Sequence, residues 1–158
     1  MPAITNCLWF HTQAAEAAEY YCGIFKNSKI NKTSYYSEGA PFPAGTVLTV
    51  DFELDGQRFT ALNGGPEFTF TEAISLQIDC ADQAEVDYYW EKLSADGGEP
   101  GYCGWLKDKY GLSWQVVPSV LADLMSGPDP EAVQRAMNVL MGQRKLIIEE
   151  LEKAYNGD

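Results

Sequence analysis

The feature that most constrains this chain is an internal repeat. The segments "AAEYYCGIF" (Ala17 to Phe25) and "EVDYYWEKL" (Glu85 to Leu93) each place an acidic residue before a Tyr-Tyr pair and an apolar residue four positions after the second tyrosine. Apolar side chains in both segments recur at helical spacing, so each is predicted to form an amphipathic helix. Two equivalent helices imply two equivalent structural units.

Strand-like runs surround both helices in the same order. One strand is predicted before each helix and three strands after it. The Asp55-Gly56 pair is a good hairpin turn between two of them. The predicted fold class is therefore α+β, with a β-α-β-β-β module used twice. The predicted strands are 4–10, 28–37, 46–54 and 57–63 in the first module, and 73–80, 99–103, 104–108 and 112–117 in the second.

Glycine and proline mark the connections between these elements. The run Gly64-Gly65-Pro66 breaks the fourth strand and lets the chain cross to the second half. We therefore expect one domain over 1–118, made of modules 1–65 and 66–118. A second Pro/Gly-rich loop, 37–45, is long enough to fold over the mouth of a cavity.

After Pro118 the pattern becomes helical, and 119–158 is predicted to be a C-terminal helical extension of the same domain. Asp129 is placed to cap one of its helices, with Pro130 at the first helical position. The tail offers more apolar surface than a solitary helix pair can hide, and a half-open sheet leaves edges that proteins normally cover. A twofold homodimer would solve both problems, with each tail packed on its own chain or on its partner.

Composition limits the possible partners. The chain has 158 residues, 46% of them hydrophobic, which is enough for one good core or two small fused ones. Its 11 basic and 23 acidic residues give a net charge of −12, which repels phosphate backbones and anionic lipid surfaces. We therefore expect neither nucleic acid nor a membrane as a partner.

The sequence also indicates a compartment. No apolar run approaches the ~20 residues that span a bilayer, and the start "MPAITNCLWFH" lacks the basic region and cleavage site of a signal peptide. The four cysteines have no C-x-x-C pairing, so disulfides and a zinc site are both disfavoured. A cytoplasmic protein with reduced thiols is the prediction.

Several segments together resemble one known family. The doubled module, with "LWFHTQAAEAAEYYCGIFKNSKI", "FELDGQRFTALNGGPEF", "VDYYWEKLS" and "CGWLKDKYGLSWQVVP", is similar to the PhnB-like branch of the vicinal oxygen chelate superfamily, which includes glyoxalase I, bleomycin-resistance and extradiol dioxygenase proteins. The resemblance implies curled half-barrel sheets and a homodimer. Members are often labelled 3-demethylubiquinone-9 3-methyltransferase, but this sequence has no Gly-rich loop after a strand that would cradle S-adenosylmethionine.

The resemblance also implies where a metal would bind, because metal-dependent members place His, Glu or Gln on the inner face of particular strands. The corresponding positions here are Asn6, Asn63, Ser75 and Gln115. None is His, Asp or Glu, and a divalent ion in a partly dry cavity needs imidazole or carboxylate ligands to offset its lost hydration. We therefore expect no metal site and no other cofactor, although weak binding of a divalent ion through Gln115, Asn63 and substrate oxygens stays open.

The chain's one histidine, His11, limits the catalytic options. It is separated from Asn6 by an odd number of positions, so its side chain is expected on the opposite strand face or in the following turn. A Cys-His pair would need Cys7, which lies too far along the strand for a hydrogen bond. Asp51 and Glu53 lie two residues apart on one strand and could form a carboxylate pair, but we expect their side chains to face solvent. No catalytic residue is predicted, and an enzyme is the less favoured class.

Neutral polar groups instead predict a binding cavity. Strand alternation directs Ser113 and Gln115 to the concave side and Trp114 and Val116 to the helix. An amide such as that of Gln115 can donate and accept hydrogen bonds with a neutral ligand. Alternatively, these groups bond one another across strands, and the aromatic ones pack in the core. The predicted ligand-binding residues are Asn6, Phe59, Asn63, Ser75, Gln77, Trp105 and Gln115.

Three hypotheses about function remain. The leading one is a homodimer that binds a small organic molecule in its concave cavity without a tightly bound metal. The second is a metal-assisted lyase, isomerase or dioxygenase. The third is a dimeric module with no ligand.

Overall fold

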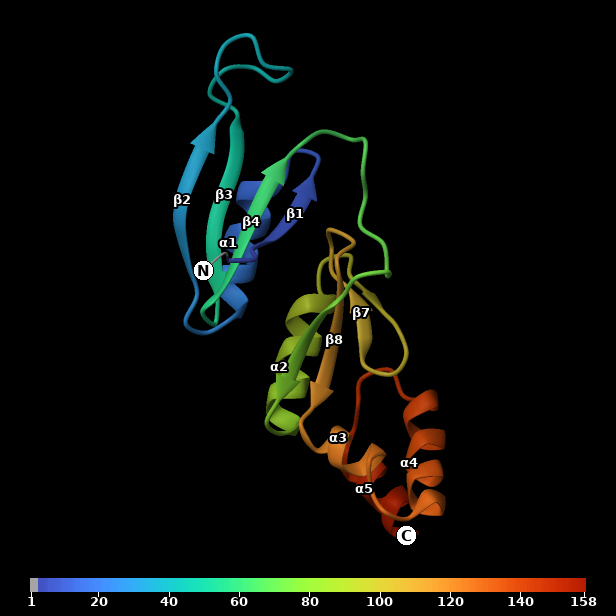
Figure 1. The fold of residues 1–158 in the computed structure, drawn as a ribbon. Helices are drawn as coiled ribbons and strands as arrows, with labels where there is room; N and C mark the ends of the chain where they lie inside the picture. The colour runs from blue at the N-terminus through green and yellow to red at the C-terminus, as the bar shows by residue number, and fades with distance from the viewer. Residues whose placement is uncertain (1–2) are drawn as a thin grey trace. The chain divides into compact units, whose positions relative to one another are not determined.

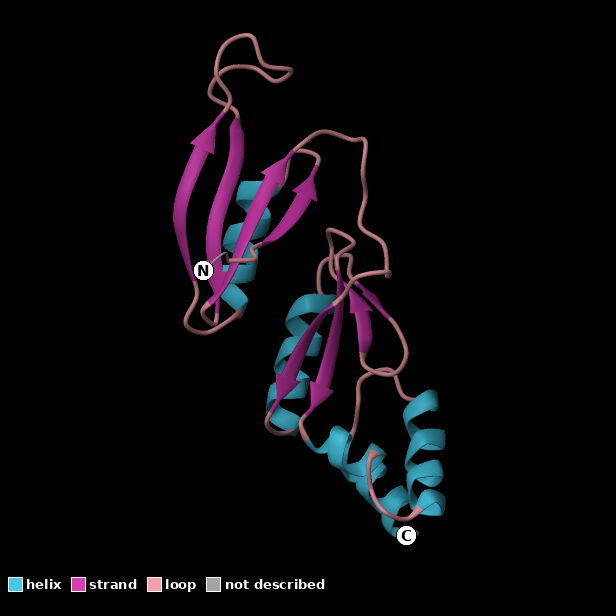
Figure 2. Ribbon diagram, in the orientation of Figure 1, coloured by secondary structure: helices cyan, strands magenta, loops and turns pink. Residues whose placement is uncertain are grey.

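In the computed structural model, which describes residues 3–158, the chain separates into two units, the first closing at Phe70 and the second opening at Thr71. The first unit contains a four-stranded sheet with one helix packed on it (Figures 1 and 2). Its strands pair in the order β1-β4-β3-β2, with β1 parallel to β4. The elements are β1 (Asn6–Phe10), α1 (Ala14–Ile24), β2 (Lys29–Tyr35), β3 (Val47–Leu54) and β4 (Gln57–Asn63).

The second unit repeats this plan. Its strands pair in the order β5-β8-β7-β6, again with the first strand parallel to the last. The predicted α+β class and the doubled β-α-β-β-β module are therefore confirmed, as two four-stranded mixed sheets that are not closed into a barrel. The elements are β5 (Leu76–Cys80), α2 (Gln83–Ser94), β6 (Glu99–Pro100), β7 (Trp105–Lys107) and β8 (Ser113–Pro118), followed by α3 (Val120–Met125), α4 (Pro130–Gly142) and α5 (Ile148–Asn156).

Alternating apolar residues attach each helix to its sheet. In β3, Val50, Phe52 and Leu54 are buried, and the ring of Phe52 stacks on Tyr21 of α1. In the second unit, Trp114 and Val116 of β8 are buried like Val86 and Leu93 of α2. Side chains at every second strand position thus pack against the side chains that recur at helical spacing in α1 and α2. Each sheet has one helix-covered face and one face without a helix, which we call the open face.

The first unit extends beyond the predicted module end at 65, because the connecting segment packs back on β1. The ring of Phe68 lies edge-on to Trp9 with centroids 5.0 Å apart, and Phe70 lies edge-on to Phe10 at 5.3 Å. A side chain at Gly64 would meet the indole of Trp9 at 2.4 Å, so glycine is required for this close approach.

The loop 37–45 folds on its own unit. Phe42 packs on Tyr36 with ring centroids 4.9 Å apart, and the Tyr36 hydroxyl donates a hydrogen bond to the carbonyl of Asn63 at 2.6 Å. The backbone N–H of Gly45 donates to the carbonyl of Tyr36. These contacts close the loop at its base.

The tail lies with the second unit. Asp129 caps α4 as predicted, and Pro130 is the first helical residue. Helix α5 begins only at Ile148, because 143–147 runs alongside the loop before β7, where the N–H groups of Cys103 and Gly104 donate to the carbonyls of Gln143 and Arg144. A small apolar cluster then forms inside the tail, made of Leu124, Leu140, Leu146 and Leu151.

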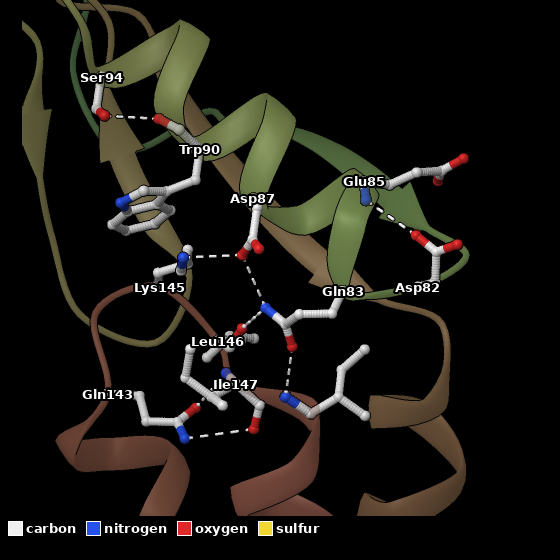
Figure 3. A network of polar contacts seen from close by, with 11 residues as sticks. Asp82, Gln83, Glu85, Asp87, Trp90, Ser94, Gln143, Lys145, Leu146 and Ile147 are labelled. Carbon is white, nitrogen blue, oxygen red and sulfur yellow. Dashed lines mark hydrogen bonds and ion pairs between the residues drawn. The ribbon is translucent and has the colours of Figure 1, made fainter.

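Polar contacts fix the tail to α2 (Figure 3). The amide of Gln83 donates to the carbonyl of Leu146 at 2.9 Å and accepts from the N–H of Ile148 at 2.8 Å. Lys145 forms an ion pair with Asp87 at 2.8 Å. One side chain of α2 therefore satisfies two backbone groups of the segment before α5. Within the described residues, no helix is long and apolar enough to cross a membrane.

Candidate functional site

The open face of the second sheet gathers four of the predicted binding residues. Gln115 of β8 lies between Gln77 of β5 and Trp105 of β7 in register. Directly opposed residues of neighbouring strands project from the same face. Ser75, just before β5, joins this row because the amide nitrogen of Gln115 donates to its hydroxyl at 3.0 Å. The sequence placed these four residues together, and the structure does so within one unit.

The two amides of this row are only partly engaged. The nitrogen of Gln77 donates to a carboxylate oxygen of Asp79 at 3.0 Å, as the nitrogen of Gln115 does to Ser75. Among the described residues, neither Oε1 atom accepts a hydrogen bond. Both amides can therefore accept from a ligand at this face.

A pocket of about 240 Å³ adjoins the row. Trp105 belongs to both, since its register partner is Gln115 and its side chain lines the pocket. Lys107 and Ser113, paired in register, also stand on the open face. The pocket is lined by Glu72, Glu99, Pro100, Gly101, Trp105, Leu106, Lys107 and Ser113.

Charge at the pocket is centred on Lys107. Its ammonium forms an ion pair with Glu72 and lies 3.9 Å from a carboxylate oxygen of Glu99. The hydrogen bond from Lys107 lowers the pKa of Glu72, and the same bond raises the pKa of Lys107. The side chains of Glu72 and Glu99 are largely exposed and that of Lys107 is 38% exposed, so water screens these contacts.

A buried carboxylate orders the turn that leads into β8. Asp108 accepts hydrogen bonds from the N–H groups of Tyr110 and Leu112 and from the indole nitrogen of Trp114 at 2.9 Å. It is only 2% exposed. The turn fixes the start of β8, and with it the positions of Ser113 and Gln115. Sequence reasoning missed Asp108, although a lone acid between a strand and a Tyr-Gly turn was its signal.

The first unit does not present its predicted residues on the open face. Asn6 and Phe59 are register partners, and strand alternation puts Asn6 on the helix side with Leu8 and Phe10. Phe59 is buried and stacks on Phe52, whose other neighbour is Tyr21 of α1. Their placement toward the concave side was wrong for this sheet.

Asn63 also lies on the helix side, where its amide has two partners. Its oxygen accepts from the N–H of Ala14, the first residue of α1, at 2.8 Å, and its nitrogen donates to the carbonyl of Val47 at 3.0 Å. The residue is 3% exposed. Asn63 therefore satisfies a donor at the start of the helix and ties β4 to β3.

Asn6, Phe59 and Asn63 lie on the helix side because successive residues of a strand point to opposite faces of the sheet. A shift of one residue moves every side chain to the opposite face. The open face of the first sheet carries Cys7, Thr60 and Asp51, with a hydrogen bond from Thr60 to Asp51 at 2.9 Å. These three are the structural equivalents of Gln77, Gln115 and Trp105. The apolar alternation of "VDFEL" in β3 was the signal that could have identified them.

The fold raises the question of a metal, and the residues present do not fit one. Ser75 and Gln115 offer only neutral oxygens, and the amide of Asn63 is committed to backbone groups. Among residues 3–158 no group of three or more His, Cys, Asp or Glu side chains could hold an ion. These residues therefore do not supply the charged or imidazole ligands that a divalent ion requires.

Comparisons with known proteins agree with this architecture. A family model described as 3-demethylubiquinone-9 3-methyltransferase matches residues 2–117. A putative 3-demethylubiquinone-9 3-methyltransferase, PhnB protein, from Bacillus cereus is 36% identical, with 74% of this chain and 99% of that chain covered and a TM-score of 0.67. No curated protein is similar enough to count as a match.

More distant structures share the fold alone. Protein PA1353 from Pseudomonas aeruginosa is 16% identical, with 75% of this chain and 98% of that one covered and a TM-score of 0.62. The fosfomycin resistance protein FosX from Listeria monocytogenes, complexed with Mn(II) and sulfate, is 14% identical, with coverages of 78% and 94% and a TM-score of 0.54. With the doubled module and the matched family model, these similarities show that the chain belongs to the PhnB-like family of the vicinal oxygen chelate superfamily.

Proposed function

We propose that this protein binds a small organic molecule on the open face of its second sheet, without a tightly bound metal. The observation that carries the proposal is the pocket of about 240 Å³ next to Gln77, Gln115 and Trp105. Ligand sites combine apolar walls with a few polar groups that fix orientation. Here Trp105 supplies apolar contact area, and the Oε1 atoms of the two amides supply acceptors.

A binding role is favoured over catalysis by the chemistry of this face. The row itself consists of two amides and a hydroxyl, and the Asp79 carboxylate beside it accepts the hydrogen bond of Gln77, an arrangement that suits ligand binding better than proton transfer. The methyltransferase description of the family adds no support, because the sequence lacks a glycine-rich loop for S-adenosylmethionine. Neutral Gln115 at the position where metal-dependent members carry glutamate is consistent with a ligand held by hydrogen bonds.

The test is a ligand screen by thermal shift, followed by titration of hits. Gln115→Leu should weaken a ligand by about 1 to 3 kcal/mol, the cost of an unmade buried hydrogen bond. Gln134→Leu, at an exposed position on α4, is the matched control and should leave affinity unchanged. Equal affinity of the wild type and Gln115→Leu for every ligand would refute the proposal. One stoichiometric metal ion per chain, lost in Gln115→Leu, would favour the metal-assisted enzyme instead.

We also propose that two chains form a homodimer. Large apolar side chains are exposed in the single chain, among them Phe68 and Met141. Exposed apolar surface of this kind is covered in symmetric assemblies. Light scattering should give twice the chain mass, and truncation after Pro118 should give monomer or aggregate; a full-length monomer would refute the dimer.

A cytoplasmic location is part of the same proposal. The four cysteines are unpaired, as in proteins kept in a reducing compartment. Cell fractionation that finds the protein outside the cytoplasm would contradict it.

A further inference from the structure

We propose that the pocket between Ser113 and Glu99 selects a molecule that carries a protonated amine on a single ring or an apolar body of similar size. The inference rests on the proposed function and specifies its ligand class. Three observations support it: an unpartnered hydroxyl, an apolar wall of suitable size and an excess of carboxylate.

Ser113 provides the first observation. Its side-chain oxygen is buried, and no described residue forms a hydrogen bond with it. The residue is 1% exposed and lines the pocket. Buried hydroxyls almost always have a partner, because an unmade hydrogen bond costs free energy. A ligand group in the pocket is the partner that this hydroxyl lacks.

Lys107 stands beside Ser113 on the neighbouring strand. It is the register partner of Ser113, and its side chain is 38% exposed. Its ion pair with Glu72 lies at the surface, where such pairs contribute little to stability. The flexible lysine can therefore move aside for a ligand at small cost.

The pocket walls are mainly apolar. Trp105 supplies the apolar side chain on the open face, and Pro100 and Leu106 also line the pocket, Leu106 with its side chain toward the helix. A buried apolar cavity of about 150 Å³ is known to hold benzene, so about 240 Å³ leaves room for one ring and a short polar substituent.

Charge selects the substituent. Two carboxylates, those of Glu72 and Glu99, face one ammonium, that of Lys107. Glu72 is the closer partner, and Glu99 lies at the outer limit of an ion pair with the same nitrogen. The surplus negative charge attracts a second cation and repels an anion. A protonated amine can pair with Glu99, donate to the Ser113 hydroxyl and lie over the ring of Trp105.

Four one-ring probes separate these features: benzylamine, benzyl alcohol, benzoate and toluene. Binding is measured by titration on ¹⁵N-labelled protein, following the indole N–H of Trp105 and the backbone N–H of Gly101. We expect benzylamine to bind at least about fivefold more tightly than benzyl alcohol, as one added charge-assisted hydrogen bond would give. Benzoate should bind more weakly than toluene.

Variants assign the selectivity to residues. Ser113→Ala should weaken benzylamine by about fivefold and leave toluene unchanged. Glu99→Gln should reduce the preference for benzylamine over benzyl alcohol. Glu91→Gln changes the net charge equally from an exposed position on α2 and should not alter that preference. Thermal melts confirm that each variant is folded.

Three results would overturn the inference: equal affinity for benzylamine and benzoate, shifts of signals outside the pocket only, or a Ser113→Ala variant with unchanged benzylamine affinity. Failure of the inference is distinguishable from failure of the proposed function. Ligands whose binding depends on Gln115 but not on Ser113 would leave the function standing and refute the amine pocket. Absence of any ligand at this face would refute both.

Discussion

The indole nitrogen of Trp114 donates a hydrogen bond to the buried carboxylate of Asp108 at 2.9 Å. Trp114 packs on the helix side of β8, whereas its neighbours Ser113 and Gln115 stand on the open face. The bond therefore links the core of the second unit to the turn that positions the candidate site. Its consequence for stability can be tested directly.

Asp108→Ala should destabilise the second unit by about 3 to 5 kcal/mol, because it leaves buried donors of Leu112 and Trp114 without an acceptor. Chemical denaturation followed by tryptophan fluorescence measures the loss. Asp123→Ala, at an exposed position on α3, is the matched control and should lie within about 0.5 kcal/mol of the wild type. An unfolding free energy unchanged in Asp108→Ala would contradict this structural role.

Ser113→Ala should have the opposite effect on the free protein. The variant removes a buried hydroxyl that has no partner among the described residues, so we expect stabilisation by about 1 kcal/mol. The melting temperature without ligand is the measurement. Ser126→Ala removes a hydroxyl that donates to the carbonyl of Ala122, and it should not stabilise. A lower melting temperature for Ser113→Ala would mean that its hydroxyl has a partner in solution.

Acid should loosen the tail from α2. The ammonium of Lys145, and then the amide of Gln83, hold the pKa of Asp87 below its ordinary value. The stability from this contact is complete above the unfolded pKa and is lost as the pH falls through the folded pKa, hence from about pH 4 downward. The hydrogen-exchange rates of the amides of 143–148, corrected for the pH dependence of intrinsic exchange, should rise in that range. Asp87→Asn should already show faster exchange at pH 7 and a smaller further rise; identical pH profiles would contradict the contact.

Gln83→Ala should detach the tail more strongly than any surface change. It leaves the carbonyl of Leu146 and the N–H of Ile148 without their partner, which we expect to cost about 1 to 3 kcal/mol. Limited proteolysis near the start of α5 is the readout. Gln134→Ala, on the exposed side of α4, is the control, and equal cleavage rates for the two variants would be inconsistent with the network in Figure 3.

Cys80 should resist thiol reagents as long as the chain is folded. Burial, and then the charge of Glu85 and neighbouring aspartates, raises the pKa of this thiol to about 12. At pH 8 almost none of it is thiolate, and thiolate is the reactive form. Mass spectrometry after iodoacetamide should find Cys80 unmodified in native protein and modified after unfolding. Modification of Cys80 ahead of exposed Cys7 would contradict its burial.

The fold could be predicted from the sequence because the repeat and the strand periods agree with each other. The Tyr-Tyr helices and their flanking strands define two identical sheet orders. The amphipathic pattern of the tail does not show that helix α5 begins only at Ile148, because backbone pairing of 143–144 with Cys103 and Gly104 keeps that segment out of the helix. Such tertiary bonds have no signal in local sequence.

The candidate site could be predicted for one sheet only. Strand alternation directed Gln115 to the concave side, and the structure pairs it in register with Gln77 and Trp105, which were predicted separately. In the first sheet, the family-based position of Asn63 was taken as concave, although it bonds to the start of α1. Phe59 was predicted as an apolar contact for the ligand, but it is buried in the core, and its neighbour Thr60 stands on the open face. The pocket and the unpartnered hydroxyl of Ser113 depend on packing that no residue pattern encodes.

Binding of a small molecule on the open face of the second sheet can be tested residue by residue. The most direct measurement is a fragment screen on ¹⁵N-labelled protein that follows the indole N–H of Trp105 and the side-chain amides of Gln77 and Gln115. We expect hits to shift these signals together in the wild type and to lose affinity in Gln115→Leu. Hits that leave all three signals in place, while shifting residues of the helix-covered face or the tail, would contradict it.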